Sequence, residues 1–178
     1  MATPPAGTYT LDQSHSEVGF SVRHAGIARV RGRFTDYSGK IVIAENFADS
    51  SVEVTIQSAS VDTKDENRDN HLRSEDFWDA ENKPTWEFKS TKIEGAGEEF
   101  AIHGDLTVNG VTKPVVLDAE YHGEGTDPFG NERVGFSATT AISRKDFNLT
   151  WNAALETGGV LVGDKVTIQL DIGAILDK

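Results

Sequence analysis

The fold is decided by one continuous segment, Phe100-Ala-Ile-His-Gly-Asp-Leu-Thr-Val108, Asn109-Gly110 and Val111-Thr-Lys-Pro-Val-Val-Leu-Asp-Ala-Glu-Tyr121. Two stretches of strand-like composition flank an Asn-Gly pair, and both residues of that pair tolerate the positive φ angles of a type I′ turn. Strands that are joined by only two residues run antiparallel, because a parallel connection needs a long crossover. The segment therefore predicts a β-hairpin within an antiparallel sheet.

Apolar and polar residues also alternate with a period of two on both sides of this hairpin. Ser51 to Gln57 is the clearest case, because Val52, Val54 and Ile56 share one face and polar residues occupy the other. The strands are apolar on one face and lack helical crossovers, so we expect an all-β antiparallel fold. The same alternation predicts further strands at 17–23, 30–37, 40–44 (after a turn at Ser38-Gly39), 85–93, 133–142 (after a loop at 123–132) and 165–173, with 143–164 irregular or briefly helical.

Both a β-sandwich and an up-and-down barrel would alternate in this way. Several strands reach nine or ten residues, which is long for a small sandwich. Glycines also fall inside strands, where they ease the bending of a closed sheet, at Gly19, Gly32, Gly104 and Gly135. These two features favour an antiparallel barrel of about eight strands, while the sandwich stays open, and an eight-stranded barrel has room for one elongated ligand.

One segment breaks the alternation, Asn67-Arg-Asp-Asn-His-Leu-Arg-Ser-Glu-Asp-Phe-Trp-Asp79. Thr63 followed by Glu66 has the pattern of a capping box at a helix N-terminus, and Ser74 can cap a second short turn. We therefore expect a short helical insert over about residues 64–79 that covers one end of the sheet with the apolar side chains of Leu72, Phe77 and Trp78.

Composition limits the classes of function. At 178 residues the chain is most simply one domain, residues 1–178. Its net charge of −12 argues against binding to nucleic acid or to an anionic membrane surface, because both need clustered Lys and Arg. No cysteine is present, which excludes disulfides and thiolate metal sites. No apolar run approaches transmembrane length, and the segment Met-Ala-Thr-Pro-Pro-Ala-Gly7 has no signal-peptide pattern. We therefore expect no stable membrane insertion and a cytoplasmic location, or export if a leader has been removed.

Motifs that are individually weak keep a specific order and spacing along nearly the whole chain. They are Tyr9-Thr-Leu-Asp12, His15-Ser16, Val18-Gly-Phe20, His24, Gly32-x-Phe34, Gly39, Thr63, Arg68-Asp-x-His-Leu72, Asp76-Phe77, Pro84, Phe88, Gly104-Asp-Leu106, Gly110-Val-Thr-Lys-Pro114, Gly135-Phe136, Arg144-x-Asp-Phe147 and Gly163-Asp164. In this order they resemble the YceI-like proteins, a lipocalin-like family that includes polyisoprenoid-binding proteins. Asn148 departs from the glycine that is common in the family, but asparagine is the next best residue for a left-handed backbone.

The resemblance implies a lipid-binding domain that is an extended eight-stranded antiparallel lipocalin-like barrel. Its tubular apolar pore would hold a long isoprenoid or a similar amphiphile. Burial of apolar surface contributes about 0.8 kcal/mol per CH₂ group, so a simple apolar tube is sufficient for tight binding. The alternative is that the inward residues fill a solid core. The candidate lining is Val18, Phe20, Val22, Phe34, Val54, Ile56, Leu72, Phe77, Trp86, Phe88, Leu106, Val108, Phe136 and Ile142.

Polar residues of the matching motifs are candidates for contact with a lipid head group. The main candidates are His15, His24, Arg68 and Arg144, and His71 of the same motifs is a further one. A guanidinium group suits phosphate because it offers several fixed donors. The alternative is a structural role, in which Arg68 pairs with Asp69 or Asp76, Arg144 pairs with Asp146, and His15 closes a turn near Asp12. The histidines lie in separate segments without ligand spacing, so we expect no bound metal and no cofactor.

The expected function is binding, with transport, storage or sequestration, of a polyisoprenoid such as a prenyl phosphate or an isoprenoid quinone. We expect no catalysis, because the sequence contains no Gly-x-Ser-x-Gly elbow, His-Glu-x-x-His pair or phosphate-binding glycine loop. The alternatives are an enzyme that acts on a prenyl compound and a stress-response interaction protein with a filled core. The expected partner is a long-chain isoprenoid lipid or quinone and not nucleic acid. The oligomeric state is open, and a homodimer is one possibility.

Overall fold

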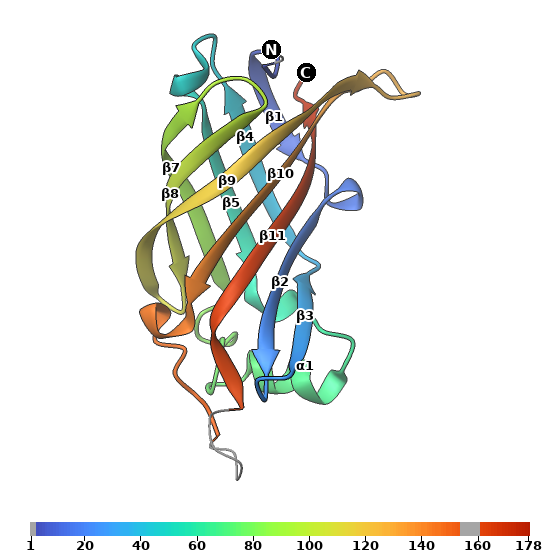
Figure 1. Ribbon diagram of the computed structural model, residues 1–178. Helices are drawn as coiled ribbons and strands as arrows, with labels where there is room; N and C mark the ends of the chain where they lie inside the picture. Colours follow the sequence, from blue (N-terminus) through green and yellow to red (C-terminus); the bar gives the residue numbers. More distant parts are fainter. Residues whose placement is uncertain (1–2, 154–160) are drawn as a thin grey trace.

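The computed structural model describes residues 3–153 and 161–178 (Figure 1). Its β-strands are β1 (Gly7–Leu11), β2 (Glu17–His24), β3 (Ala28–Phe34), β4 (Tyr37–Ile43), β5 (Ser51–Gln57), β6 (Val61–Asp62), β7 (Thr85–Gly95), β8 (Glu99–Val108), β9 (Val111–Thr126), β10 (Glu132–Ser143) and β11 (Val162–Leu176). The helix α1 spans Glu66–Arg73, and 3₁₀ turns occupy Gln13–His15, Phe47–Asp49, Ser58–Ser60 and Arg144–Phe147. No helix in the described ranges is both long enough and apolar enough to span a membrane.

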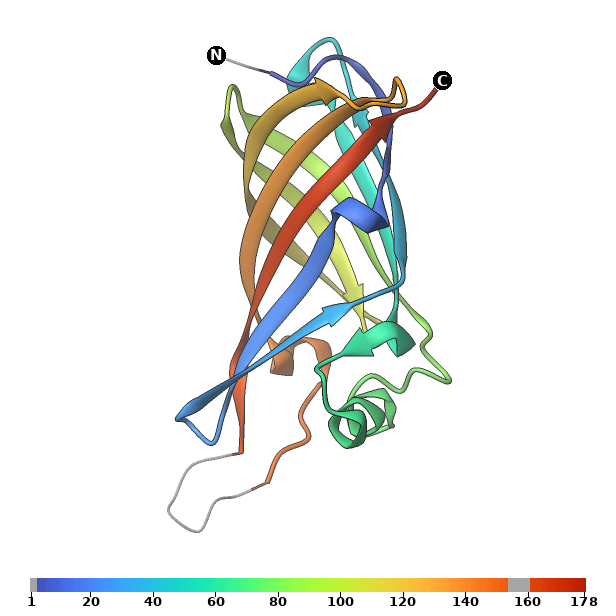
Figure 2. The same ribbon diagram turned by 90° about the vertical axis from the view of Figure 1, so that its right-hand side faces the viewer.

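The strands close into an eight-stranded antiparallel barrel, as predicted (Figures 1 and 2). The order is β1-β4-β5-β7-β8-β9-β10-β11, and β11 pairs back with β1. β2 and β3 prolong β1 and β4 beyond short breaks, and β6 pairs with β3 after the end of β5. As a result, β11 pairs with β2 from Val162 to Asp171 and with β1 from Ala174 to Leu176.

The two ends of the barrel differ (Figure 2). Both chain termini lie at one end, which we call the termini end. The helix α1 and the tip of the β2–β3 hairpin lie at the opposite end, which we call the helix end.

Several predicted strand boundaries are wrong. β1 was not predicted, although it closes the barrel. Ser38-Gly39 lies inside β4 rather than in a turn, because β4 continues β3 beyond a kink at 35–36. β9 and β10 pair as far as Thr126 and Glu132, which shortens the predicted loop at 123–132. The irregular segment predicted at 143–164 contains a 3₁₀ turn and the start of β11, and its residues 154–160 lie outside the described residues.

The predicted helical insert is present as α1, but its N-terminus is capped differently. Asp65 is the N-cap, and its carboxylate accepts a hydrogen bond from the Arg68 backbone N–H at 3.1 Å. The Thr63 hydroxyl instead donates to the buried carboxylate of Asp69 at 2.5 Å. The expected capping box of Thr63 with Glu66 is therefore wrong, because a buried carboxylate competes for the hydroxyl.

Two of the predicted strand glycines make room for aromatic rings. A Cβ at Gly32 would lie 2.3 Å from Phe20 Cζ, and Gly32 is the cross-strand partner of Phe20. A Cβ at Gly104 would lie 2.3 Å from Phe88 Cζ in the same way. These rings therefore lie flat against the wall over a neighbouring glycine. Besides easing curvature, the two glycines keep the ring atoms out of the centre of the barrel.

Candidate functional site

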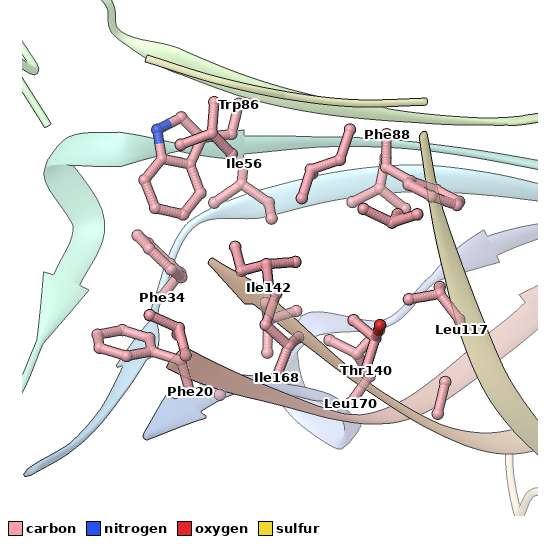
Figure 3. A pocket seen from close by; sticks show the side chains of 18 of the residues that line it. Phe20, Phe34, Ile56, Trp86, Phe88, Leu117, Thr140, Ile142, Ile168 and Leu170 are labelled. Atoms are coloured by element: carbon pink, nitrogen blue, oxygen red, sulfur yellow. The ribbon is translucent and has the colours of Figure 1, made fainter. Parts of the chain in front are cut away.

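The barrel encloses a cavity of about 330 Å³ whose walls are mainly apolar side chains (Figure 3). This volume lies within the range of about 300–1,000 Å³ that is typical of ligand pockets. The inward residues of the strands form the walls, because alternate side chains of a strand point to the same face. Ile56, Phe88, Leu117 and Leu170 surround the middle of the cavity in Figure 3.

The predicted inward positions surround a cavity rather than a solid core. All fourteen of them belong to its lining. They come from β2, β3, β5, β7, β8 and β10 and from the insert, and they are Val18, Phe20, Val22, Phe34, Val54, Ile56, Leu72, Phe77, Trp86, Phe88, Leu106, Val108, Phe136 and Ile142. Their position is a finding, whereas lipid binding by them stays a prediction.

Aromatic rings narrow the cavity near the termini end. The rings of Phe47 and Phe100 meet edge to face with centroids 5.0 Å apart. Phe136 lies 6.2 Å from Phe100 and 5.4 Å from Tyr121 by the same measure. The Tyr121 hydroxyl is buried without a hydrogen-bond partner in the described chain, and burial raises the pKa of this phenol. No charged side chain belongs to this cluster of described residues. The cluster can therefore contact the apolar tail of a ligand.

A second aromatic cluster lies near the helix end. Phe34 and Trp86 pack with centroids 4.8 Å apart, and Trp78 lies 5.1 Å from Trp86. The insert supplies Trp78, as the sequence predicted, because its backbone N–H donates to the Leu72 carbonyl and so folds the chain back under the barrel. Sequence reasoning missed Trp151, whose ring lies 5.2 Å from Phe77 and also lines the cavity.

Polar groups reach the cavity at the helix end as well. Arg68, His24 and His71 line it there, and all three belong to the motifs that the sequence singled out as polar candidates. Arg68 donates through Nε to Thr63 Oγ1 and through Nη2 to the Thr63 carbonyl, each at 2.8 Å. The expected pairing of Arg68 with Asp69 or Asp76 is therefore wrong. His71 bonds to Asp76 through Nε2 at 2.8 Å instead.

Two of the predicted head-group residues have structural roles. His15 lies outside the cavity lining, and its Nδ1 is 2.7 Å from Asp12 Oδ2, as in the alternative that the sequence left open. Arg144 does line the cavity, but its buried guanidinium donates to four backbone carbonyls rather than to Asp146. These carbonyls belong to Leu149, Trp151, Val162 and Gly163, at 2.8–3.3 Å. Burial lowers the pKa of Arg144.

Thr140 is a polar residue of the wall that sequence reasoning also missed. Its hydroxyl is seen among Ile142, Ile168 and Leu170 in Figure 3, and it has no hydrogen bond to the described part of the chain. The signal in the sequence was its parity, because Thr140 lies two residues from Ile142 on the same strand face. A polar group of a ligand that lies beside Thr140 can therefore form one hydrogen bond with its hydroxyl.

The described residues contain no group of three or more His, Cys, Asp or Glu side chains that could hold a metal ion. The cavity offers mainly apolar walls, with the Thr140 hydroxyl among them and the charged or ionisable side chains of Arg68, His24 and His71 at the helix end. Three serines, Ser50, Ser51 and Ser137, also belong to its lining.

Comparison with known proteins agrees with this architecture. A YceI-like domain model matches residues 9–174. A UPF0312 protein of Photorhabdus laumondii is 45% identical over 146 residues, which are 80% of this chain and 76% of that protein. The crystal structure of the Campylobacter jejuni YceI protein has a TM-score of 0.75 and 34% identity, and covers 100% of both chains.

A more distant structure has the same fold. It is a polyisoprenoid-binding domain from Saccharophagus degradans that is implicated in plant cell wall breakdown. Its TM-score is 0.71 at 16% identity, with 97% of this chain and 100% of that chain covered. At this identity the likeness concerns the fold alone. The match of the domain model over residues 9–174 shows that the chain belongs to the YceI-like domain family.

Proposed function

We propose that this protein binds a polyisoprenoid, either a prenyl phosphate or an isoprenoid quinone, inside the barrel and carries, stores or sequesters it without catalysis. The observation that carries the proposal is the hollow barrel with its apolar lining. A saturated or prenyl chain has no group to hydrogen-bond, so apolar walls provide its binding energy at about 0.8 kcal/mol per CH₂. The polyisoprenoid-binding domain with the same fold is consistent with this ligand class.

The distribution of polar groups supports one orientation of the lipid. Arg68, His24 and His71 line the helix end, whereas the aromatic cluster at the termini end has no charged member among the described residues. A head group desolvated next to an apolar cluster would lose its hydrogen bonds to water without replacement. We therefore propose that the head group lies at the helix end and that the tail points to the termini end.

Titration of the delipidated protein tests this proposal. The probes are a prenyl alcohol, a prenyl phosphate and a prenyl quinone of equal tail length, followed by calorimetry. All three should bind with one ligand per barrel, and affinity should rise with tail length because each added unit buries more apolar surface. Affinity that does not change with tail length would count against occupation of the cavity. The cytoplasmic location stays a prediction from the sequence.

A further inference from the structure

Positive charge is concentrated on one outer face of the barrel, although the whole chain has a net charge of −12. The exposed outer face of the β2–β3 hairpin carries four arginines, which we call the arginine face: Arg23, Arg29, Arg31 and Arg33. Arg33 pairs with Asp62 at 3.4 Å, whereas the other three form no ion pair with any residue that the structure describes. The local charge of this face is therefore opposite in sign to the net charge of the chain.

The strand register places these charges close together. Arg23 and Arg29 are direct cross-strand partners, and Ser21 is the partner of Arg31. Like charges that lie directly opposite on a sheet destabilise it, so this arrangement is unfavourable for folding. The acidic cross-strand neighbours lie farther from the tip, where Asp62 of β6 is the partner of Arg33 and Asp171 of β11 is the partner of Glu17. Positive charge therefore increases from the middle of the barrel toward the hairpin tip.

The tip itself carries an apolar side chain. Ile27 is 88% exposed in the turn between β2 and β3, and this turn projects at the helix end (Figure 2). The next residues along the hairpin, Arg23 and His24, also belong to the lining of the cavity. One exposed apolar side chain, a cluster of arginines and the end of a lipid-sized cavity thus meet at one place.

We propose that the tip and the arginine face of the β2–β3 hairpin dock the protein on an anionic phospholipid surface. Ile27 enters the head-group layer, and the arginines contact the phosphates, each contributing to the attraction while it lies near the surface. This is peripheral binding and requires no membrane-spanning segment. A membrane fits better than an acidic protein, because docking at this tip brings the end of the cavity to the bilayer from which a lipid would enter.

The opposite end offers a matched comparison. Phe129 is 85% exposed in the loop between β9 and β10, so it projects an apolar side chain as Ile27 does. Acidic residues flank it, namely Asp127 in the same loop, which pairs with Arg133, and Glu132 at the start of β10. An anionic membrane would repel this end. The proposal therefore predicts that the two exposed apolar tips behave differently.

The test uses the purified full chain in a vesicle flotation assay. Vesicles of equal parts phosphatidylcholine and phosphatidylglycerol are compared with vesicles of phosphatidylcholine alone, at low and high salt. The wild-type chain should float with the anionic vesicles only, and less at high salt because salt screens exposed charges. Arg29→Glu with Arg31→Glu should lower the partition coefficient at least about tenfold. Ile27→Ser should lower it about fivefold, because the isoleucine is no longer buried.

Two control variants make the same kinds of substitution on other parts of the surface. Lys89→Glu with Lys113→Glu changes the net charge equally on exposed positions of β7 and β9, and Phe129→Ser removes the other apolar tip. Both should float as the wild type does. If the double arginine variant does not fold, as judged by circular dichroism, Arg29→Gln with Arg31→Gln takes its place and should still reduce flotation.

Several outcomes would overturn the proposal. Equal binding to neutral vesicles, or equal loss in the lysine control, would show that the arginine face is not responsible. Absence of vesicle binding together with arginine-dependent retention on polyglutamate resin would assign the surface to an acidic protein instead. The choice of a membrane as the partner rests on the proposed function, but the assay needs no prenyl ligand, so its failure can be distinguished from a failure of the titration described above.

Discussion

The indole rings of Trp78 and Trp86 lie with their centroids 5.1 Å apart at the helix end of the cavity, and both ring N–H groups are buried without a hydrogen-bond partner in the described chain. A buried, unpaired donor is costly because it has lost its hydrogen bond to water. These two side chains come from the insert and from β7, which are separate elements. The helix end of the cavity is therefore where an acceptor on a ligand would be most favourable.

Tryptophan emission should report directly on the occupied cavity. The chain contains 3 tryptophans, and Trp78, Trp86 and Trp151 all line the cavity near the helix end. Quinone rings quench indole emission at short range, so a prenyl quinone should quench strongly. A prenyl alcohol of equal tail length should shift the emission without strong quenching. If the quinone binds by calorimetry but leaves the emission unchanged, its head group lies at the termini end and the proposed orientation is wrong.

A charge in the wall should abolish lipid retention. Phe136→Asp places a carboxylate among the aromatic rings of the termini end, where its charged form is poorly solvated. We expect the variant to lose bound prenyl lipid while Val116→Asp, at an outward position of β9 that is 42% exposed, keeps it. Lipid content per folded protein is the readout. A folded Phe136→Asp variant that retained its lipid would show that the tail does not reach this end.

The glycine beneath the Phe20 ring should control the width of the cavity. A methyl group at Gly32 would lie 2.3 Å from Phe20 Cζ, so Gly32→Ala should push this ring toward the cavity and weaken binding of a prenyl chain. Gly125→Ala is the control, because a Cβ there meets no atom within 4 Å. Calorimetry should show the affinity falling about tenfold for Gly32→Ala, as overpacking of this kind costs about 1–3 kcal/mol. Equal affinities of Gly32→Ala and Gly125→Ala would indicate that the Phe20 ring moves without narrowing the cavity.

Arg144 should contribute to stability more than to ligand selection. Its guanidinium holds the carbonyls of Leu149, Trp151, Val162 and Gly163, which are left without this donor in Arg144→Met. The free energy of unfolding should fall by at least about 3 kcal/mol, because several carbonyls lose a charged donor and each buried acceptor left unsatisfied costs about 1–3 kcal/mol. Lys145→Met, at the exposed neighbouring position, should change little in a urea titration. The opposite result would be an unchanged stability of Arg144→Met together with the loss of a preference for a prenyl phosphate over a prenyl alcohol. That result would assign Arg144 to the head group after all.

Acid should weaken the barrel at the break between β1 and β2. Arg133 donates to Asp12 at 2.8 Å and to Asp127 at 2.7 Å, and its hydrogen bond to Asp12 holds the pKa of that carboxyl below the usual range. A folded-state pKa below the ordinary value of about 3.9 gives stability that is complete above that value and is lost as the pH falls below it. Asp12→Asn should lower stability near neutral pH by about 2 kcal/mol.

The same substitution should flatten the decline in stability below about pH 4, because the titrating carboxyl is gone. Urea midpoints measured across this range for the wild type, for Asp12→Asn and for Asp118→Asn, an exposed control on β9, provide the comparison. An Asp12→Asn curve parallel to that of the wild type would show that Asp12 does not carry the acid sensitivity.

The sequence predicted the inward face of each strand well, because side-chain parity along a strand is a local property. Val54 and Ile56 illustrate this, since alternation alone places both on the cavity wall. Strand ends were harder to predict. The hydrogen bonds that extend β9 to Thr126 come from β10, and β1 is held by β4 and β11, which are distant in sequence. Such contacts leave no periodic signal in the strand itself.

The polar residues of the site could be predicted by type but not by partner. Carbonyl groups surround Arg144 only because Val162 and Gly163 begin β11 beside it. Thr63 was expected to cap a helix but donates to Asp69, whose burial depends on the folded insert. The openness of the barrel also had no local signal, since inward apolar residues occur in solid and hollow barrels alike. The cavity depends on how the rings of residues such as Phe20 pack against the wall.

The measurement that tests the central claim most directly is mass spectrometry of the organic extract from the natively purified protein, with an empty-vector preparation as the control. The account predicts a prenyl compound or an isoprenoid quinone in stoichiometric amount, absent from the control and from the Phe136→Asp variant. If the extract is clean, the same protein is incubated with added prenyl lipids, purified again and extracted. A chain that carries no prenyl lipid in either extract would contradict the account, and the barrel would then have another occupant or none.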